Sequence, residues 1–320
     1  PKIGRGERHE DPLRRAVETV IRAVRRIAVS ETEQMNPVDG AVCIVTGASR
    51  GLGERIAHAL SARGARVAIT GRDAQRLATV AGEMSARYGV EPVWSAFDLR
   101  DREAAAEFVA DVEARLGTPS VLMNNAAILG PVGPMIDVDL AEWWGAIETN
   151  ILGTASMTAA AGRAMAGAGR GVIVNISGGG VGGSRIAGAM SAYTTSKAAV
   201  VQLTETAAKE FEPHGVRVVA VAPGPFATDL TNNIIAAGPE TAGTELFEAA
   251  LRDRATEGDW TAFERMLIYV ISPTAAWLTG RLLSARWETP ESLQALATHA
   301  GDASLYRLRR VDGTLVFTAP

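Results

Sequence analysis

Apolar runs alternate with stretches of helical periodicity along most of the chain, from residue 41 to residue 285. Short runs without polar alternation are typical of strands buried on both faces of a parallel sheet. We therefore predict an α/β fold, a doubly wound parallel sheet of about seven strands (Rossmann-type) with helices on both faces. The expected strands are residues 41–45, 66–70, 93–97, 121–123, 171–177, 216–222 and 281–285.

The segment before the first strand has a different pattern. Residues 12–28 predict an amphipathic helix that begins at a proline and carries arginines opposite its apolar stripe. We favour a stripe that packs on this subunit or a neighbour over a basic helix that lies on an anionic membrane. A transit peptide is disfavoured by Glu7, Glu10, Asp11 and Glu18, since such peptides are poor in acidic residues. The stripe consists of Leu13, Val17, Val20, Ile21, Val24 and Ile27.

Composition and charge exclude several classes of protein. The chain has 320 residues and a net charge of −4 without a long basic run, which argues against nucleic acid as the main partner. The single cysteine, Cys43, lies in an apolar run, so we expect neither disulfides nor a thiolate metal cluster. The 4 histidines lack metal-ligand spacing, and we expect no metal site. No apolar segment approaches the roughly 20 residues that span a bilayer, so we expect a cytoplasmic globular protein.

The first apolar run leads directly into a glycine-rich turn, Thr46-Gly-Ala-Ser-Arg-Gly-Leu-Gly53, and a helical pattern follows. A dinucleotide site requires this order of strand, glycine turn and helix. Gly47 permits the tight turn, Gly51 lets the backbone approach a pyrophosphate, and Gly53 lets the helix press against the sheet. The phosphates would then meet the N-terminus of the helix.

The end of the second expected strand bears on the choice of cofactor. An acidic residue there would bind the ribose 2′-hydroxyl of NAD, whereas an arginine matches the 2′-phosphate of NADP. This chain has Gly71 followed by Arg72, and Arg50 in the glycine turn can flank the same phosphate. We therefore expect NADP(H) rather than NAD(H). The alternative is that Arg72 is solvated and Asp73 binds the ribose.

Tyr193 and Lys197 lie four residues apart in an alanine-rich stretch without glycine or proline. In a helix this spacing puts both side chains on one face, with Cβ atoms roughly 5–6 Å apart. A free tyrosine has a pKa of about 10, and an ammonium about 4 Å away at an effective dielectric near 20 contributes about 4 kcal/mol. We therefore expect Lys197 to lower the pKa of Tyr193 enough to make it an acid–base group.

Three motifs occur in order: T-G-x-x-x-G-x-G at 46–53, N-N-A-A at 124–127 and Y-x-x-x-K at 193–197. With them, the chain resembles the compact single-domain branch of the short-chain dehydrogenase/reductases (SDRs). We accordingly expect an N-terminal helical extension at 1–37, a dinucleotide-binding catalytic domain at 38–285 and a C-terminal extension at 286–320. In the last part, residues 291–299 have a helical pattern and residues 315–317 that of a short strand.

The resemblance implies roles for residues outside these motifs. It makes Asn150 the anchor of a proton-relay water, and it makes the loop from Pro223 to Thr228 the holder of the nicotinamide carboxamide. Asp98 follows the third strand, where its carboxylate or backbone can meet the adenine. The predicted cofactor-binding residues are Gly47, Ser49, Arg50, Gly51, Leu52, Gly53, Arg72, Asp98, Leu99, Asn124, Ala126, Tyr193, Lys197, Pro223, Gly224, Phe226 and Thr228.

The chain departs from the family pattern beside the tyrosine. The resemblance implies two serines at the end of the fifth strand, of which the second hydrogen-bonds the substrate carbonyl. Here Ser177 matches the first, and Gly178 takes the place of the second. Three alternatives stay open: Ser177 serves, Ser184 takes over, or catalysis relies on Tyr193 without a serine. Losing one such donor typically costs about 10²–10³ in rate.

We interpret the chain as an NADPH-dependent reductase of a ketone or aldehyde, or the reverse alcohol dehydrogenase, with Tyr193, Lys197, Asn150 and Ser177 as catalytic residues. Its partner is a small carbonyl or alcohol substrate. One alternative is a non-catalytic NADP(H) sensor or scaffold, and another is epimerisation or elimination through a transient ketone. The resemblance also implies a homo-oligomer, and because family tetramers often meet through the last strand, the C-terminal extension leaves dimer and tetramer open.

Overall fold

The computed structural model describes residues 36–178, 181, 188–256, 258–302 and 304–308. From Pro37 onward the chain forms one compact unit. The predicted helix at 12–28 and the short strand at 315–317 lie outside the described residues. No helix in the described ranges is long and apolar enough to cross a membrane.

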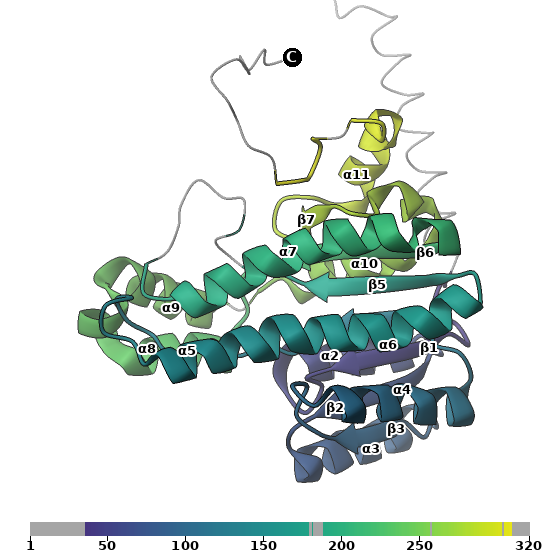
Figure 1. Ribbon diagram of the computed structural model, residues 1–320, viewed down its shortest axis with the longest axis horizontal. Helices are drawn as coiled ribbons and strands as arrows, with labels where there is room; N and C mark the ends of the chain where they lie inside the picture. The colour runs from purple at the N-terminus through teal and green to yellow at the C-terminus, as the bar shows by residue number, and fades with distance from the viewer. Residues whose placement is uncertain (1–35, 179–180, 182–187, 257, 303, 309–320) are drawn as a thin grey trace, which may run out of the picture. The chain divides into compact units, whose positions relative to one another are not determined.

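A parallel sheet forms the centre of the unit, and its strands are the predicted ones to within a residue or two. In the described part of the chain the sheet has 7 strands in the order β3-β2-β1-β4-β5-β6-β7 (Figure 1). The strand order reverses between β1 and β4, the switch point at which such sheets bind ligands. The strands are β1 (Val42–Thr46), β2 (Arg66–Gly71), β3 (Val93–Ala96), β4 (Val121–Asn124), β5 (Gly171–Ile176), β6 (Val216–Ala222) and β7 (Leu282–Ser284).

Both faces of the sheet are buried, which explains the continuous apolar runs. In β1, Cys43 and Val45 face one core, and Val42 and Ile44 face the other. The first core receives α2 (Gly51–Ser61), α3 (Ala74–Tyr88) and α10 (Trp260–Ile271). The second core receives α4 (Arg102–Leu116), α6 (Gly153–Gly167) and α7 (Ser191–Phe211), and α6 and α7 run beside each other across β5 (Figure 1).

Two further helices, α8 (Asp229–Ala242) and α9 (Thr244–Thr256), pack against each other beyond the carboxyl end of β5 (Figure 1). Gly238, with φ +74°, interrupts α8 just before Pro239. The periodicity of residues 229–256 did not predict this pair, because glycine and proline interrupt it.

The remaining elements are short. α5 (Leu140–Ile147) continues through a π-helical turn, η1 (Glu148–Leu152), into α6. The others are η2 (Glu212–His214), η3 (Pro273–Leu278), α11 (Pro290–Leu296) and η4 (Ala297–His299). π-Helical turns inside α-helices are frequent at functional sites, and this one carries Asn150.

Candidate active site

A cavity of about 1770 Å³ opens beyond the carboxyl ends of the parallel strands. The glycine loop after β1, the ends of β2, β4, β5 and β6, the start of α7, and the pair α8–α9 all contribute to its walls. The glycine motif and the tyrosine–lysine motif, which lie far apart in the sequence, therefore share one cavity.

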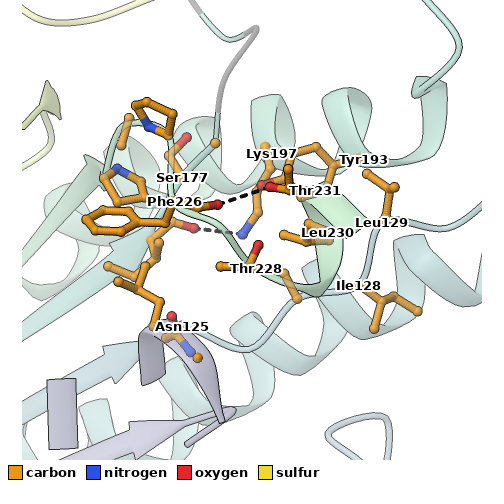
Figure 2. Close-up of a pocket in the computed structure, with 18 of the residues that line it drawn as sticks. Asn125, Ile128, Leu129, Ser177, Tyr193, Lys197, Phe226, Thr228, Leu230 and Thr231 are labelled. Atoms are coloured by element: carbon orange, nitrogen blue, oxygen red, sulfur yellow. Dashed lines mark hydrogen bonds between the residues drawn. The ribbon is translucent and has the colours of Figure 1, made fainter. Parts of the chain in front are cut away.

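Tyr193 and Lys197 project from the first turns of α7 into this cavity (Figure 2). Lys197 is buried, and its Nζ donates a hydrogen bond to the backbone oxygen of Ile176 at the end of β5, 2.7 Å away. The same nitrogen lies 5.8 Å from the centroid of the Tyr193 ring. The helical spacing thus brings the two side chains together as predicted.

The pKa values of this pair differ from the sequence-based expectation. Burial raises the pKa of Tyr193 to about 12 and lowers the pKa of Lys197 to about 8. Desolvation disfavours the charged form of both groups, so in the protein alone Lys197 does not lower the tyrosine pKa as we expected. At pH 7 Tyr193 holds its proton and Lys197 its charge, which makes the tyrosine a proton donor.

Asn150 lies behind the cavity and does not line it. Its Oδ1 accepts from the backbone nitrogen of Ile128 at 2.8 Å, and its Nδ2 donates to Ile128 O and Ser196 Oγ at 2.8 and 2.9 Å. Ser196 in turn donates to the backbone oxygen of Tyr193. The amide therefore ties the loop after β4 to the first turn of α7, and its predicted role in holding a relay water stays a prediction.

Ser177 and Gly178 follow β5 and line the cavity beside Tyr193. Ser177 is buried, and within the described part of the chain its Oγ has no hydrogen-bond partner. A Cβ placed on Gly178 would lie 2.4 Å from the Tyr193 hydroxyl oxygen. The tyrosine thus occupies the space that a side chain at 178 would need. Ser184, the second serine considered, lies outside the described residues.

The glycine loop has the close backbone approaches that its motif implies. Gly47 has φ +65°, and a Cβ there would lie 2.7 Å from the Ala126 Cα. A Cβ on Gly53 would lie 2.2 Å from the Gly47 oxygen. Asn125 braces the loop, since its Nδ2 donates to the backbone oxygens of Thr46 and Gly47 at 3.0 and 3.3 Å. Only glycines fit these positions, so the loop packs closely against Ala126 and against its own turn.

Arg50 and Arg72 both line the cavity on the side of β2. Arg50 forms an ion pair with Asp229 at the start of α8, with Nη2 and Oδ2 2.7 Å apart. Asp73 does not line the cavity; its Oδ1 caps α3 by accepting from the backbone nitrogen of Arg76 at 3.0 Å. Of the two residues considered as ligands of the ribose or its phosphate, Arg72 therefore lines the cavity and Asp73 lies outside it.

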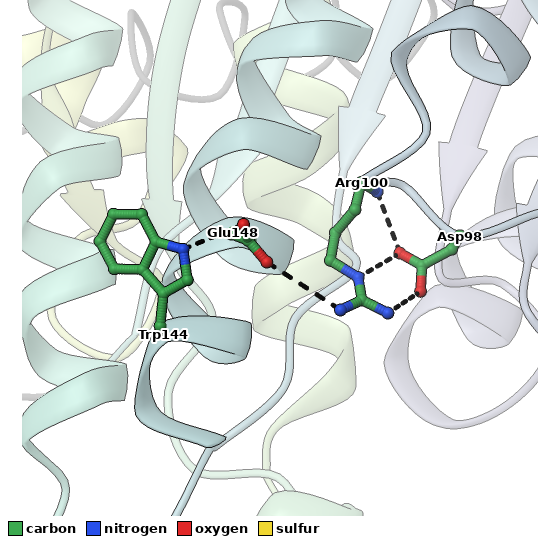
Figure 3. Close-up of polar contacts among 4 residues, drawn as sticks. All are labelled: Asp98, Arg100, Trp144 and Glu148. Atoms are coloured by element: carbon green, nitrogen blue, oxygen red, sulfur yellow. Dashed lines mark hydrogen bonds and ion pairs between the residues drawn. The ribbon is translucent and has the colours of Figure 1, made fainter. Parts of the chain in front are cut away.

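Asp98 and Leu99 line the cavity after β3. The Asp98 carboxylate binds the side chain of Arg100, with Oδ2 2.8 Å from Nη2, and this contact lowers the pKa of Asp98 (Figure 3). Arg100 also lies 4.0 Å from Glu148, which accepts from the Trp144 indole nitrogen at 2.9 Å. The predicted contact of Asp98 with the adenine, through its carboxylate or its backbone, stays a prediction.

The structure separates the two asparagines at the end of β4. Asn125 lines the cavity, whereas the Asn124 amide is buried away from it and donates to Thr158 Oγ1 and Asn175 Oδ1 at 3.0 and 2.8 Å. Asn124 therefore braces the sheet, and of the two asparagines it is Asn125 that lines the cavity. The remaining residues of the predicted cofactor set all line the cavity.

The loop after β6 reaches the cavity through Pro223, Gly224, Phe226 and Thr228. The Phe226 ring is buried against Phe263, with ring centroids 5.7 Å apart. Thr231 fixes the loop from α8, because its Oγ1 donates to the Phe226 backbone oxygen at 3.0 Å (Figure 2). The loop is thereby held at the place where the resemblance puts the nicotinamide.

Sequence reasoning did not single out other residues of the cavity wall, notably Asp229, Asp253, Arg286 and Trp287. Their segments carry no motif, and only the fold brings them to the site. It also missed Glu54, His58 and Glu83, whose ligand atoms lie within 4.8 Å of one another. None of these three lines the cavity, and we assign them no role.

Comparison with known proteins identifies this arrangement. Residues 41–238 match the family model described as short chain dehydrogenase. The chain belongs to the short-chain dehydrogenase/reductase family. Like the relatives described next, it is an oxidoreductase acting on CH–OH groups.

Two relatives are named for sugar acids or polyols. The gluconate 5-dehydrogenase of Gluconobacter oxydans is 31% identical over 249 residues, which cover 77% of this chain and 93% of the relative. The galactitol 2-dehydrogenase (L-tagatose-forming) of Cereibacter sphaeroides is 34% identical over 251 residues, covering 77% and 94%.

Solved SDR structures share the fold and hold either cofactor. An NAD⁺-bound xylitol dehydrogenase superposes with a TM-score of 0.68 at 26% identity, covering 77% of this chain and 98% of its own. A metagenomic SDR in complex with NADP is 37% identical with a TM-score of 0.55, covering 63% and 91%. The SDR neighbours therefore bind NAD or NADP.

Proposed function

We propose that this protein reduces a ketone or aldehyde with NADPH, or oxidises the corresponding alcohol, with Tyr193 as general acid/base. The observation that carries the proposal is that Tyr193 and Lys197 lie in the same cavity as a glycine loop suited to a dinucleotide. The phenol is protonated at neutral pH, because burial raises its pKa to about 12. This protonation state supports the reductive direction.

The residues present fit a dinucleotide. A side chain at Gly47 or Gly53 would collide with neighbouring backbone, and the loop leads directly into the N-terminus of α2, where backbone amides can bind a pyrophosphate. Bound NADPH would supply the hydride. The start of α2 would hold the phosphates, and the loop from Pro223 to Thr228 would hold the nicotinamide end.

In this proposal, each of the four polar residues has a separate role in the reaction. Tyr193 donates its proton to the carbonyl oxygen, and the charged Lys197 stabilises the phenolate that this transfer leaves. Ser177 donates its otherwise unpartnered hydroxyl to the carbonyl and orients it. Asn150 keeps α7 in register with the loop after β4 through its bonds to Ile128 and Ser196.

We also propose that NADP(H) is preferred over NAD(H). The support is that Arg72 lines the cavity at the end of β2, while the competing Asp73 caps α3 outside it. Calorimetric titration of both oxidised cofactors tests this preference: NADP⁺ should bind more tightly, and Arg72→Ala should remove most of the difference. Tighter binding of NAD⁺ by the wild-type protein would refute it.

The reaction itself is tested by following NADPH absorbance with a panel of aldehydes, ketones and 3-oxoacyl thioesters. We expect NADPH oxidation with at least one carbonyl class and none with the substrate omitted. Tight NADPH binding without oxidation by any member of the panel would contradict the proposed reaction.

A further inference from the structure

On one side of Tyr193 the wall of the cavity is apolar. The Tyr193 ring packs against a cluster whose buried members are Leu129, Met190, Ile234, Ala242 and Ala250. All five of these residues also line the cavity. On this side Tyr193 therefore packs against apolar side chains that line the cavity.

Four parts of the chain build this wall. Leu129 comes from the loop after β4 and Met190 from the residue before α7, while α8 and α9 contribute one face each. Leu230 and Ile234 are four residues apart on α8, as are Leu246 and Ala250 on α9, and this spacing places each pair on one helix face. Figure 2 shows Leu129 and Leu230 beside Tyr193.

Polar side chains also line the cavity on α8 and α9, and two of them, Thr231 and Asp253, border the apolar wall. The Thr231 hydroxyl donates to the Phe226 backbone oxygen and is not available to a ligand as a donor. Asp253, the next cavity residue along α9 after Ala250, is half-buried, and the charge of Arg286 acts on it. The apolar compartment thus extends from Tyr193 to Asp253.

We propose that the group attached to the reacting carbonyl is a hydrocarbon chain or ring, and that the substrate is not a polyhydroxylated sugar acid or polyol like those for which the relatives are named. This inference rests on the proposed function of the same cavity. Burying one methylene group improves binding by about fourfold, whereas burying an unpaired hydroxyl costs roughly tenfold to a hundredfold.

Equilibrium binding tests the inference separately from the reaction. Straight-chain methyl ketones from butanone to decan-2-one are titrated by calorimetry into the protein saturated with NADP⁺, which cannot reduce them. We expect the Kd to fall by about fourfold per methylene until the compartment is full, and fructose and tagatose to bind more weakly than every ketone beyond the shortest. A Kd independent of chain length, or tighter binding of a ketose, would overturn the inference.

A matched pair of variants on α9 tests whether the cavity wall is where the hydrocarbon chain binds. Leu246→Gln changes a half-buried residue of the cavity wall, and Leu251→Gln changes a residue of the same helix that is 42% exposed and outside the wall. We expect the first to raise the Kd of decan-2-one about tenfold and the second to leave it unchanged. Equal effects of both variants would count against the inference.

The same ketones, tested with NADPH, distinguish the two proposals. If the ketones bind more tightly with chain length but do not oxidise NADPH, the apolar compartment is supported and the proposed reduction is refuted. If ketoses oxidise NADPH rapidly and the rate does not rise with ketone chain length, the protein is a reductase and the proposal of an apolar substrate is refuted.

Discussion

Gly178 stands where the resemblance to the family implies a serine. A Cβ there would lie 2.4 Å from the Tyr193 hydroxyl, so restoring the family serine with Gly178→Ser should displace the tyrosine. We expect kcat/KM to fall by on the order of 10²-fold, because small displacements of a reacting group cost about that much. Gly188→Ser is the control, since a Cβ at Gly188 meets nothing within 4 Å. Faster turnover by Gly178→Ser would show that only a hydroxyl was missing.

The charge of Lys197 should control the pH dependence of reduction. Burial lowers its pKa from 10.5 to about 8, so in the folded protein Lys197 is charged below that pH and neutral above it. Tyr193 keeps its proton over the whole interval, because burial raises its pKa to about 12. We expect kcat/KM for reduction to be constant below pH 7 and to decline above about pH 8. A profile that stays flat up to the pKa of a free lysine would contradict this.

Single residues were predictable where spacing along one helix determines them. Tyr193 and Lys197 share a face because they are four residues apart, and this held in the structure. Asn124 and Asn125 show where such prediction fails. Adjacent residues at the end of a strand point in different directions, and the sequence does not indicate which of the two faces the glycine loop. The ion pair of Arg50 with Asp229 joins residues far apart in the sequence, so only the fold reveals it.

At the scale of elements, the close contact between α2 and the glycine loop should be sensitive to substitution. A Cβ on Gly53 would lie 2.2 Å from the Gly47 oxygen and 2.5 Å from Asn125 Nδ2. We expect Gly53→Ala to cost about 1–3 kcal/mol in the free energy of unfolding and to weaken NADPH binding. Denaturant titration and calorimetry measure the two effects.

Gly82→Ala in α3 is the matched control for Gly53→Ala. Its Cβ would meet nothing within 4 Å, and glycine is less favourable than alanine inside a helix by about 0.5–1 kcal/mol. This variant should therefore be more stable than the wild type. If both substitutions lowered the free energy of unfolding equally, the close contact at Gly53 would not be the cause of the destabilisation.

The elements of the central sheet were predictable because each strand is buried on both faces and leaves a continuous apolar run. The pair α8–α9 was not, because Gly238 and Pro239 interrupt its pattern and several of its apolar side chains face a cavity and not a core. The sequence also did not predict that α5 continues through a π-helical turn into α6, because no residue pattern marks such a turn.

At the scale of the whole molecule, the described part of the C-terminal extension is tied to the catalytic domain. Leu282 in β7 donates from its backbone nitrogen to Tyr306 O at 2.8 Å, and the buried Arg281 donates to Ala300 O at 2.6 Å. Residues up to 308 therefore complete the compact unit. The predicted homo-oligomer stays a prediction.

Arg281 should be a major determinant of stability. Its guanidinium also donates to Trp277 O, and hydrogen bonds to a charged group contribute about 1.5–3 kcal/mol each. We expect Arg281→Met to lower the free energy of unfolding by roughly 3 kcal/mol or more, measured by denaturant titration. Arg115→Met, at a side chain that is 51% exposed, is the control and should change stability little. Equal stability of the two variants would refute the role of Arg281.

The acid–base role of Tyr193 is the central claim, and single-turnover oxidation of bound NADPH tests it most directly. Tyr193→Phe removes the phenol oxygen and leaves the ring packed in its apolar cluster, so NADPH affinity should stay within about twofold of wild type, while the loss of a general acid typically costs about 10²–10⁴ in rate. A slow single turnover with intact NADPH binding is the predicted result. A Tyr193→Phe protein that oxidises NADPH at the wild-type rate would contradict it.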